Sequence, residues 1–108
     1  MTGFVQIIEW STSRIDEVQA LQDQWRDRFP DMGPSRVTMC ADRKRLGTYL
    51  TIVEFESHEQ AMENSAHPAT HEFAQRMAEL CDAPAVFHDL DVMRSEVRLP
   101  SGRQAATA

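Results

Sequence analysis

Hydrophobic and polar residues alternate imperfectly in four short segments of the chain, and these segments are rich in β-branched or aromatic side chains. We expect these segments to be strands. They cover Phe4–Trp10, Arg36–Ala41, Tyr49–Phe55 and Ala85–Met93. In the first and third segments both alternating faces are substantially apolar, whereas a strand with one wetted face is polar at every second position. We therefore expect both faces of the resulting sheet to be covered.

An amphipathic helix is expected after the first strand, because apolar residues recur there at spacings of three and four. This stripe runs from Ile15 to Phe29, where Pro30 prevents the helix from continuing. Hydroxyl side chains precede the stripe and are candidate caps for its first turn. They are Ser11, Thr12 and Ser13.

A second helical region is expected after the third strand, and it should be broken in two. Ser57 stands three residues before Gln60, which is the capping-box spacing. Pro68 disfavours helical geometry at the residue before it and suits the first position of a new helix. The two pieces are expected over 57–66 and 68–82.

The expected order of elements is β-α-β-β-α-β, which is the ferredoxin-like pattern of the α+β class. It implies a four-stranded antiparallel sheet with helices on one side and a second helix broken at Pro68. The opposite side of the sheet is also apolar, and a second copy of the chain related by a two-fold axis would cover it. We expect one domain over residues 1–94, a loose tail over 95–108, and a homodimer.

The composition excludes some functional classes. The 108 residues carry a net charge of −6, which argues against nucleic-acid binding because that requires a basic face. The sequence has no long apolar run, so we expect no membrane span. The amino terminus lacks the features of a signal peptide. Two cysteines, Cys40 and Cys81, are too few for a disulfide scaffold, so we expect a cytoplasmic protein.

The chain resembles a known superfamily in its order of elements and in two stretches, FVQIIEW and VEFESHEQAMENSAHPATHEF. These resemble the dimeric α+β barrel proteins, and within them the antibiotic-biosynthesis-monooxygenase-like (ABM-like) branch, over Phe4–Met93. The resemblance implies a pocket between sheet and helices, and cofactor-independent oxidation of an aromatic, polyketide-like substrate. The superfamily also contains haem-degrading enzymes, isomerases and cyclases. A different reaction, or a non-catalytic dimer that binds a small apolar ligand, is therefore the alternative.

A comparison of three functional positions argues against membership of the haem-degrading branch of the superfamily. That branch uses an Asn on the first strand, a Trp on the second helix and a His as iron ligand. The matching positions here are Gln6, Asn64 and Phe73. Phenylalanine cannot ligate iron, and His71 lies about 200° around the helix from Phe73. We therefore expect no haem and no other cofactor.

Four residues are candidates for substrate binding. Gln6 and Asn64 match pocket positions of the superfamily, and each amide would orient a ligand or bond to neighbouring protein groups instead. Trp10 would line the mouth of the pocket and Tyr49 its wall, and ordinary packing is the alternative for both rings.

The histidines raise two further possibilities. His67 and His71 are four residues apart and Glu72 is adjacent, but Pro68 breaks the helical register and there is no H-E-x-x-H pattern. Surface positions, or a helix cap at His67, are the favoured interpretation, and we expect no metal site.

His88 is the candidate catalytic base, because it lies beside Asp89 and Asp91 on the fourth strand and a neighbouring carboxylate can hold an imidazole for proton transfer. Polarity at an exposed sheet edge is the alternative. The hairpin loop at 42–47 carries three basic residues, and a solvated turn is favoured over a phosphate site. The chain has no Gly-rich phosphate loop, G-x-S-x-G elbow or paired-cysteine cluster.

Overall fold

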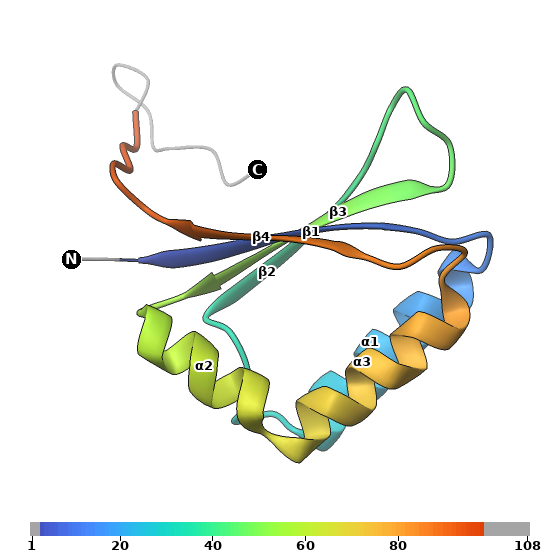
Figure 1. Ribbon diagram of the computed structural model, residues 1–108, viewed down its shortest axis with the longest axis horizontal. Coiled ribbons are helices and arrows are strands. Elements are labelled where there is room, and N and C mark those ends of the chain that lie inside the picture. The colour runs from blue at the N-terminus through green and yellow to red at the C-terminus, as the bar shows by residue number, and fades with distance from the viewer. Residues whose placement is uncertain (1–2, 99–108) are drawn as a thin grey trace.

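A four-stranded antiparallel sheet forms one layer of the protein, and three helices lie on one side of it in the computed structural model (Figure 1). The structure describes residues 3–98. The elements are β1 (Phe4–Ser11), α1 (Ile15–Arg28), β2 (Arg36–Ala41), β3 (Thr48–Phe55), α2 (His58–Ala66), α3 (Pro68–Leu80) and β4 (Val86–Asp91). The spatial order of strands is β2-β3-β1-β4, which confirms the predicted ferredoxin-like α+β fold. None of the helices in this part of the chain has the length and apolar character needed to cross a bilayer.

The predicted break between the second and third helices is present. His67 has an extended backbone (φ −71°, ψ 134°), and Pro68 begins α3. The Nδ1 atom of His67 accepts a hydrogen bond from the backbone N–H of Ala69 at 3.0 Å, so His67 caps α3. At the start of α2, the Ser57 hydroxyl accepts from the backbone N–H of Gln60 at 3.1 Å. Both caps satisfy helix N–H groups that would otherwise lack partners.

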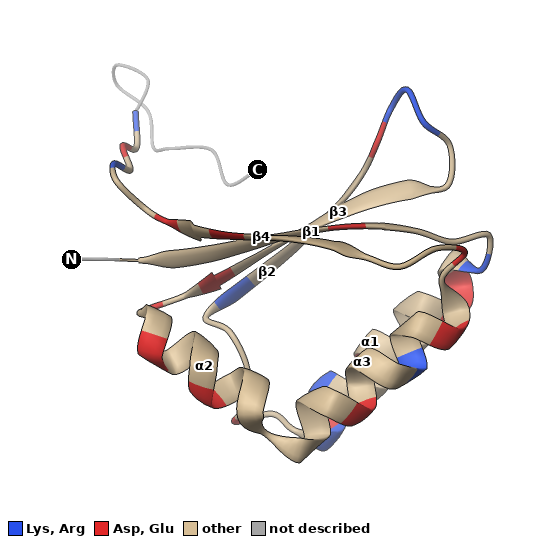
Figure 2. Ribbon diagram, in the orientation of Figure 1, with Lys and Arg blue, Asp and Glu red and all other residues tan. Residues whose placement is uncertain are grey.

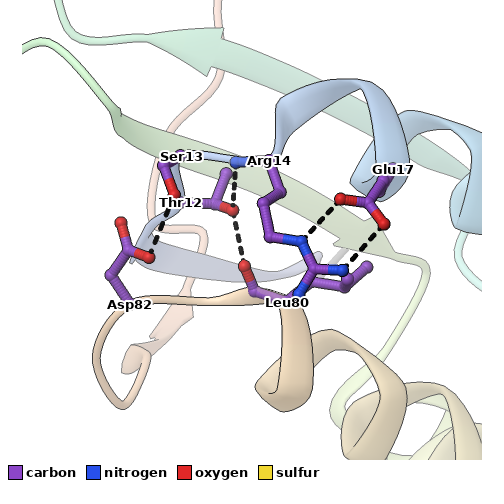
Figure 3. Close-up of polar contacts among 6 residues, drawn as sticks. All are labelled: Thr12, Ser13, Arg14, Glu17, Leu80 and Asp82. Carbon is purple, nitrogen blue, oxygen red and sulfur yellow. Dashed lines mark hydrogen bonds and ion pairs between the residues drawn. The ribbon is translucent and has the colours of Figure 1, made fainter.

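The start of α1 differs from the prediction. Arg14 is the N-cap residue and makes no side-chain cap bond. The hydroxyl of Thr12 accepts from the backbone N–H of Arg14 at 2.9 Å and donates to the carbonyl of Leu80 at 2.6 Å (Figure 3). Thr12 therefore joins the start of α1 to the end of α3. Its own backbone N–H donates to the carbonyl of Gly47, whose φ of 81° favours glycine.

Replacing Thr12 with valine is expected to lower the free energy of unfolding by about 2 kcal/mol. Valine keeps the shape of threonine but leaves the carbonyl of Leu80 and the N–H of Arg14 without this hydroxyl, at a site where Thr12 is 2% exposed. Urea unfolding followed by circular dichroism measures the change. Ser13→Ala is the matched control, because Ser13 is exposed and its bond to Asp82 is 3.5 Å long. Equal stability of the two variants would contradict the role assigned to Thr12.

The core has two parts, and each joins a different set of elements. Beneath one end of the sheet, Phe4 and Phe55 pack with Ala61 of α2, and Phe4 and Phe55 are direct partners in the β1–β3 register. Between α1 and α3, the buried residues are Val18, Leu21, Trp25 and Ala69. The indole N–H of Trp25 donates to the carbonyl of Ala69 at 3.0 Å. The helices are thus held to each other as well as to the sheet.

The face of the sheet opposite the helices, here called the outer face, has an apolar centre. Strand alternation and register place six apolar side chains on it. They are Val5, Ile7, Leu50, Ile52, Val86 and Leu90. Val86 and Leu90 are 49% and 43% exposed in the single chain. The side of the sheet away from the helices is therefore apolar too, as the sequence predicts from the apolar residues on both faces of the strands.

Candidate functional site

Three of the predicted site residues share the face of the sheet that is turned toward the helices, here called the inner face. Alternation along β1 puts Gln6 and Trp10 on the same side as Phe4, which packs against α2. Tyr49 is the direct partner of Trp10 in the β1–β3 register, so it lies on that side too. The structure thus brings Gln6, Trp10 and Tyr49 onto one surface.

Gln6 is bonded to a carboxylate on the neighbouring strand. Its Nε2 atom donates to Oδ1 of Asp89 at 2.7 Å, and the two residues are direct partners in the β1–β4 register. In the sequence, Asp89 is notable only as a neighbour of His88, and its role as a site residue comes from the structure. Alternation along β4 shows that residues 87, 89 and 91 share one face and that 86, 88 and 90 share the other. The sequence does not show that Asp89 pairs with Gln6, because that depends on the register between β4 and β1.

Asn64 holds a buried acceptor that has no donor. It lies three residues after Ala61 on α2, so it shares the side of α2 that faces the sheet. Its Oδ1 atom is shielded from solvent and has no hydrogen-bond partner in the described residues. Leaving a buried acceptor unpaired costs about 1–3 kcal/mol. Among residues 3–98, this is the one buried side-chain nitrogen or oxygen atom that has no hydrogen-bond partner.

Trp10 and Tyr49 form a packed aromatic pair. Their rings stack with centroids 4.8 Å apart, and Trp10 is only 3% exposed. The indole N–H of Trp10 donates to the hydroxyl of Thr51 at 2.8 Å. Because this donor is already used within the protein, the geometry matches the packing interpretation of Trp10 better than a hydrogen bond to a ligand.

His88 lies across the sheet from the other candidates. It is the register partner of Ile7, whereas its neighbour Asp89 is the partner of Gln6. Successive side chains of a strand point to opposite faces, so His88 is on the outer face. The structure therefore does not bring His88 together with Gln6, Asn64, Trp10 and Tyr49 within one chain.

The inner face is open beside β4. Phe87 is the register partner of Ile8 and lies on the inner face, yet it is 57% exposed. Ile8 and Val53 are half-buried although they lie at the centre of the sheet. In Figure 1, α1 and α3 run side by side under one end of the sheet, and α2 lies under the other end. The open inner face thus combines apolar side chains with the Gln6–Asp89 pair.

The basic hairpin between β2 and β3 is involved in ion pairs. Arg45 bonds to Asp42 at 3.0 Å and to Glu9 at 3.1 Å. The backbone N–H of Lys44, and then the Arg45 side chain, lower the pKa of the Asp42 carboxyl. These contacts agree with a solvated turn.

His67 and His71 lie at the junction of α2 and α3 and on α3, respectively. His71 is exposed on α3, and His67 uses Nδ1 in its cap. Within residues 3–98, no group of three or more His, Cys, Asp or Glu side chains could hold a metal ion.

Solved structures with this arrangement of elements are known, although no protein-family model and no curated protein sequence matches the chain. A mutant of SnoaB, a cofactor-independent oxygenase from Streptomyces nogalater, superposes with a TM-score of 0.71 at 14% identity over 87% of this chain and 95% of SnoaB. A Bordetella bronchiseptica protein, provisionally named an antibiotic biosynthesis monooxygenase, gives 0.71 at 16% identity over 89% and 100%. Rv0793 from Mycobacterium tuberculosis gives 0.69 at 14% identity over 89% and 99%.

Each superposition covers nearly the whole of the compared protein, so the similarity extends to the complete arrangement of strands and helices. Their low sequence identity limits them to the fold. They agree with the resemblance seen in the strand and helix pattern of the sequence. The chain therefore has the ferredoxin-like fold of the antibiotic-biosynthesis-monooxygenase-like proteins.

Proposed function

We propose that this protein is a small enzyme resembling cofactor-independent monooxygenases, and that it binds a hydroxylated aromatic substrate between the inner face and α2. The observation that carries the proposal is the buried, unpartnered Oδ1 atom of Asn64. The fold shared with SnoaB, a cofactor-independent oxygenase, supports it.

A ligand hydroxyl would remove the cost of the unpaired Asn64 oxygen. Oδ1 is an acceptor, so the matching ligand group is a donor such as a phenolic or enolic O–H. The side chains that shield this oxygen would move aside as the ligand enters. Ligand binding would then recover a hydrogen bond that the free protein lacks, and this gain favours a hydroxylated ligand over a purely apolar one.

The open part of the inner face suits the rest of an aromatic ligand. Ile8 and Val53 offer half-buried apolar surface, and Phe87 offers an exposed ring at the β4 side. Aromatic rings pack well against such surfaces in offset or edge-on arrangements. Gln6 and Asp89 lie in the same strip of the face and supply polar contacts at its margin.

The reaction in this proposal starts at an acidic C–H bond of the aromatic substrate. Loss of the proton leaves the electron pair on carbon, and the resulting carbanion adds to molecular oxygen as a peroxide. Return of a proton gives a hydroperoxide, and loss of water leaves a carbonyl, so a CH2 group and O2 become C=O and H2O. The protein would position the substrate and exclude bulk water around the carbanion.

We further propose that the working form is a homodimer joined through the outer faces. In a single chain, the apolar centre of the outer face would contact water. In a symmetric dimer, the same patch of a second copy would cover it. Arg36 pairs with Glu54 at the margin of this face, and Glu9, which pairs with Arg45, lies between Leu50 and Val86 on the same face. A polar rim around an apolar centre is the usual anatomy of a protein–protein interface.

A non-catalytic ligand-binding dimer, or a cyclase or isomerase in the same site, is the alternative. The observation that favours it is the absence of a free acid–base pair among the candidates on the inner face. Trp10 uses its N–H within the protein, and His88 lies on the outer face. Such a protein would bind hydroxylated aromatics and consume no oxygen.

Oxygen uptake with 1,8-dihydroxyanthrone, a tricyclic aromatic with phenolic hydroxyls and an acidic CH2 group, tests the proposal. Asn64→Ala is expected to lower kcat/KM at least about tenfold, because it removes the acceptor for the substrate hydroxyl. Ser65→Ala is the matched control, since Ser65 is the next residue of α2 and is exposed. Binding of 1,8-dihydroxyanthrone without oxygen uptake would support the alternative, and equal kinetics for both variants would remove Asn64 from the site.

A further inference from the structure

We infer that the Asp89 carboxylate selects neutral, hydroxyl-bearing aromatic ligands over aromatic acids, and that Gln6 positions this carboxylate. The inference rests on the proposed function, because it concerns the ligand of the same inner face. Three observations carry it: the Gln6–Asp89 bond, the unpaired oxygen of Asp89, and the sign of the charges on this face.

The Gln6 amide uses only half of the Asp89 carboxylate. The bond from Nε2 reaches Oδ1 at 2.7 Å, and Oδ2 of this exposed carboxylate receives no hydrogen bond from a protein donor in the described part of the chain. An ionised carboxylate accepts hydrogen bonds at both oxygens and donates none. A group that binds at Oδ2 must therefore be a donor, such as the hydroxyl of a phenol, and a ligand carboxylate cannot replace it.

The charge of the inner face opposes an anionic ligand. Asp89 is the register partner of Gln6 and Asp91 is the partner of Phe4, so both carboxylates lie on this face. Figure 2 shows acidic positions on β4 and basic positions in the β2–β3 hairpin, and the strand order β2-β3-β1-β4 separates β4 from the strands of that hairpin by β1. Arg36 pairs with Glu54 on the outer face. A ligand anion beside Asp89 would meet like charge without a nearby compensating cation among these residues.

Gln6 determines where the Asp89 carboxylate lies. Gln6 is half-buried on the central strand β1, whereas Asp89 is exposed on the edge strand β4. Hydrogen bonds to a charged acceptor are stronger than those between neutral groups, so the more fixed side chain holds the more mobile one. Gln6 is therefore a positioning residue, and Asp89 is the group that contacts the ligand.

The test compares 2-naphthol with 2-naphthoate, which share a ring system and differ in charge at neutral pH. Isothermal titration gives the dissociation constant of each probe. We expect the wild type to prefer 2-naphthol, and Asp89→Asn to reduce that preference about tenfold or more. Asp91→Asn is the matched control, because Asp91 has the same charge on the same face but no bond to Gln6. We expect it to change the preference less than about twofold.

A double-mutant cycle tests the role of Gln6. Gln6→Ala is expected to weaken the preference in the wild type and to have no further effect when Asp89 is already Asn. An undiminished preference in Asp89→Asn, with 2-naphthol still bound, would overturn this inference and leave the proposed site intact. Failure of the wild type to bind either probe would instead contradict the proposed aromatic site, and with it the selection by Asp89.

Discussion

Replacing Trp25 with alanine is expected to lower the free energy of unfolding by about 3–5 kcal/mol. Trp25 is 8% exposed and lies in the part of the core that joins α1 to α3. Its ring is 5.7 Å from the rings of both Phe29 and Phe73. Alanine would leave a cavity at this point and remove the hydrogen bond to the carbonyl of Ala69. A domain of this size has only about 5–15 kcal/mol of net stability.

A second variant separates packing from hydrogen bonding at this position. Trp25→Phe keeps most of the ring contacts and removes the indole donor, so its loss should be about 1–2 kcal/mol. Denaturant unfolding followed by far-ultraviolet circular dichroism is the measurement, because it reports both helices directly. A loss below about 1 kcal/mol for Trp25→Ala would show that α1 and α3 are held mainly by other contacts.

Replacing Ile52 with glutamate is expected to dissociate the proposed dimer and to raise its dissociation constant about 100-fold or more. Ile52 lies on the outer face as the register partner of both Ile7 and Thr38. In a two-fold dimer each copy would place this carboxylate in the apolar centre, and neither charge would have a partner. Size-exclusion chromatography with light scattering measures the mass at micromolar concentration.

Met62→Glu is the control for this experiment. Met62 is 41% exposed on α2, and α2 lies on the side of the sheet opposite the outer face (Figure 1), so the same kind of substitution there should leave the mass unchanged. If the wild-type protein runs as a monomer at micromolar concentration, the proposal of a dimer through the outer face is wrong. Retention of the dimer by Ile52→Glu would place the interface elsewhere.

Much of the fold could be predicted because its signals are local. The strand segments have period-two patterns, and the observed β2 has the predicted bounds, Arg36–Ala41. Pro68 acts on its immediate neighbours, so the break between α2 and α3 could be predicted from a single residue. The end of α1 shifted by one residue, from Phe29 to Arg28, which is within the usual fraying of helix ends.

The site was less predictable because its contacts join distant parts of the chain. The Gln6–Asp89 bond spans 83 positions and the Trp10–Thr51 bond spans 41. Alternation shows that His88 and Asp89 face opposite ways, but only the register with β1 shows which of them meets Gln6. Thr12 was expected to cap α1, and its link to Leu80 depends on the end of α3 lying beside that turn. Of the proposed tail over 95–108, residues 99–108 lie outside the described part.

The strand order has a consequence for synthesis of the protein. Strand β1 is central in the sheet, yet both of its neighbours, β3 and β4, come later in the chain. On the ribosome, β1 must wait with two unpaired edges until β3 emerges, and one edge stays unpaired until β4 follows. Such distant pairings give a high contact order and slow folding, and open edges recruit other nascent chains. Translational pauses between β3 and β4 are therefore expected to increase co-translational aggregation.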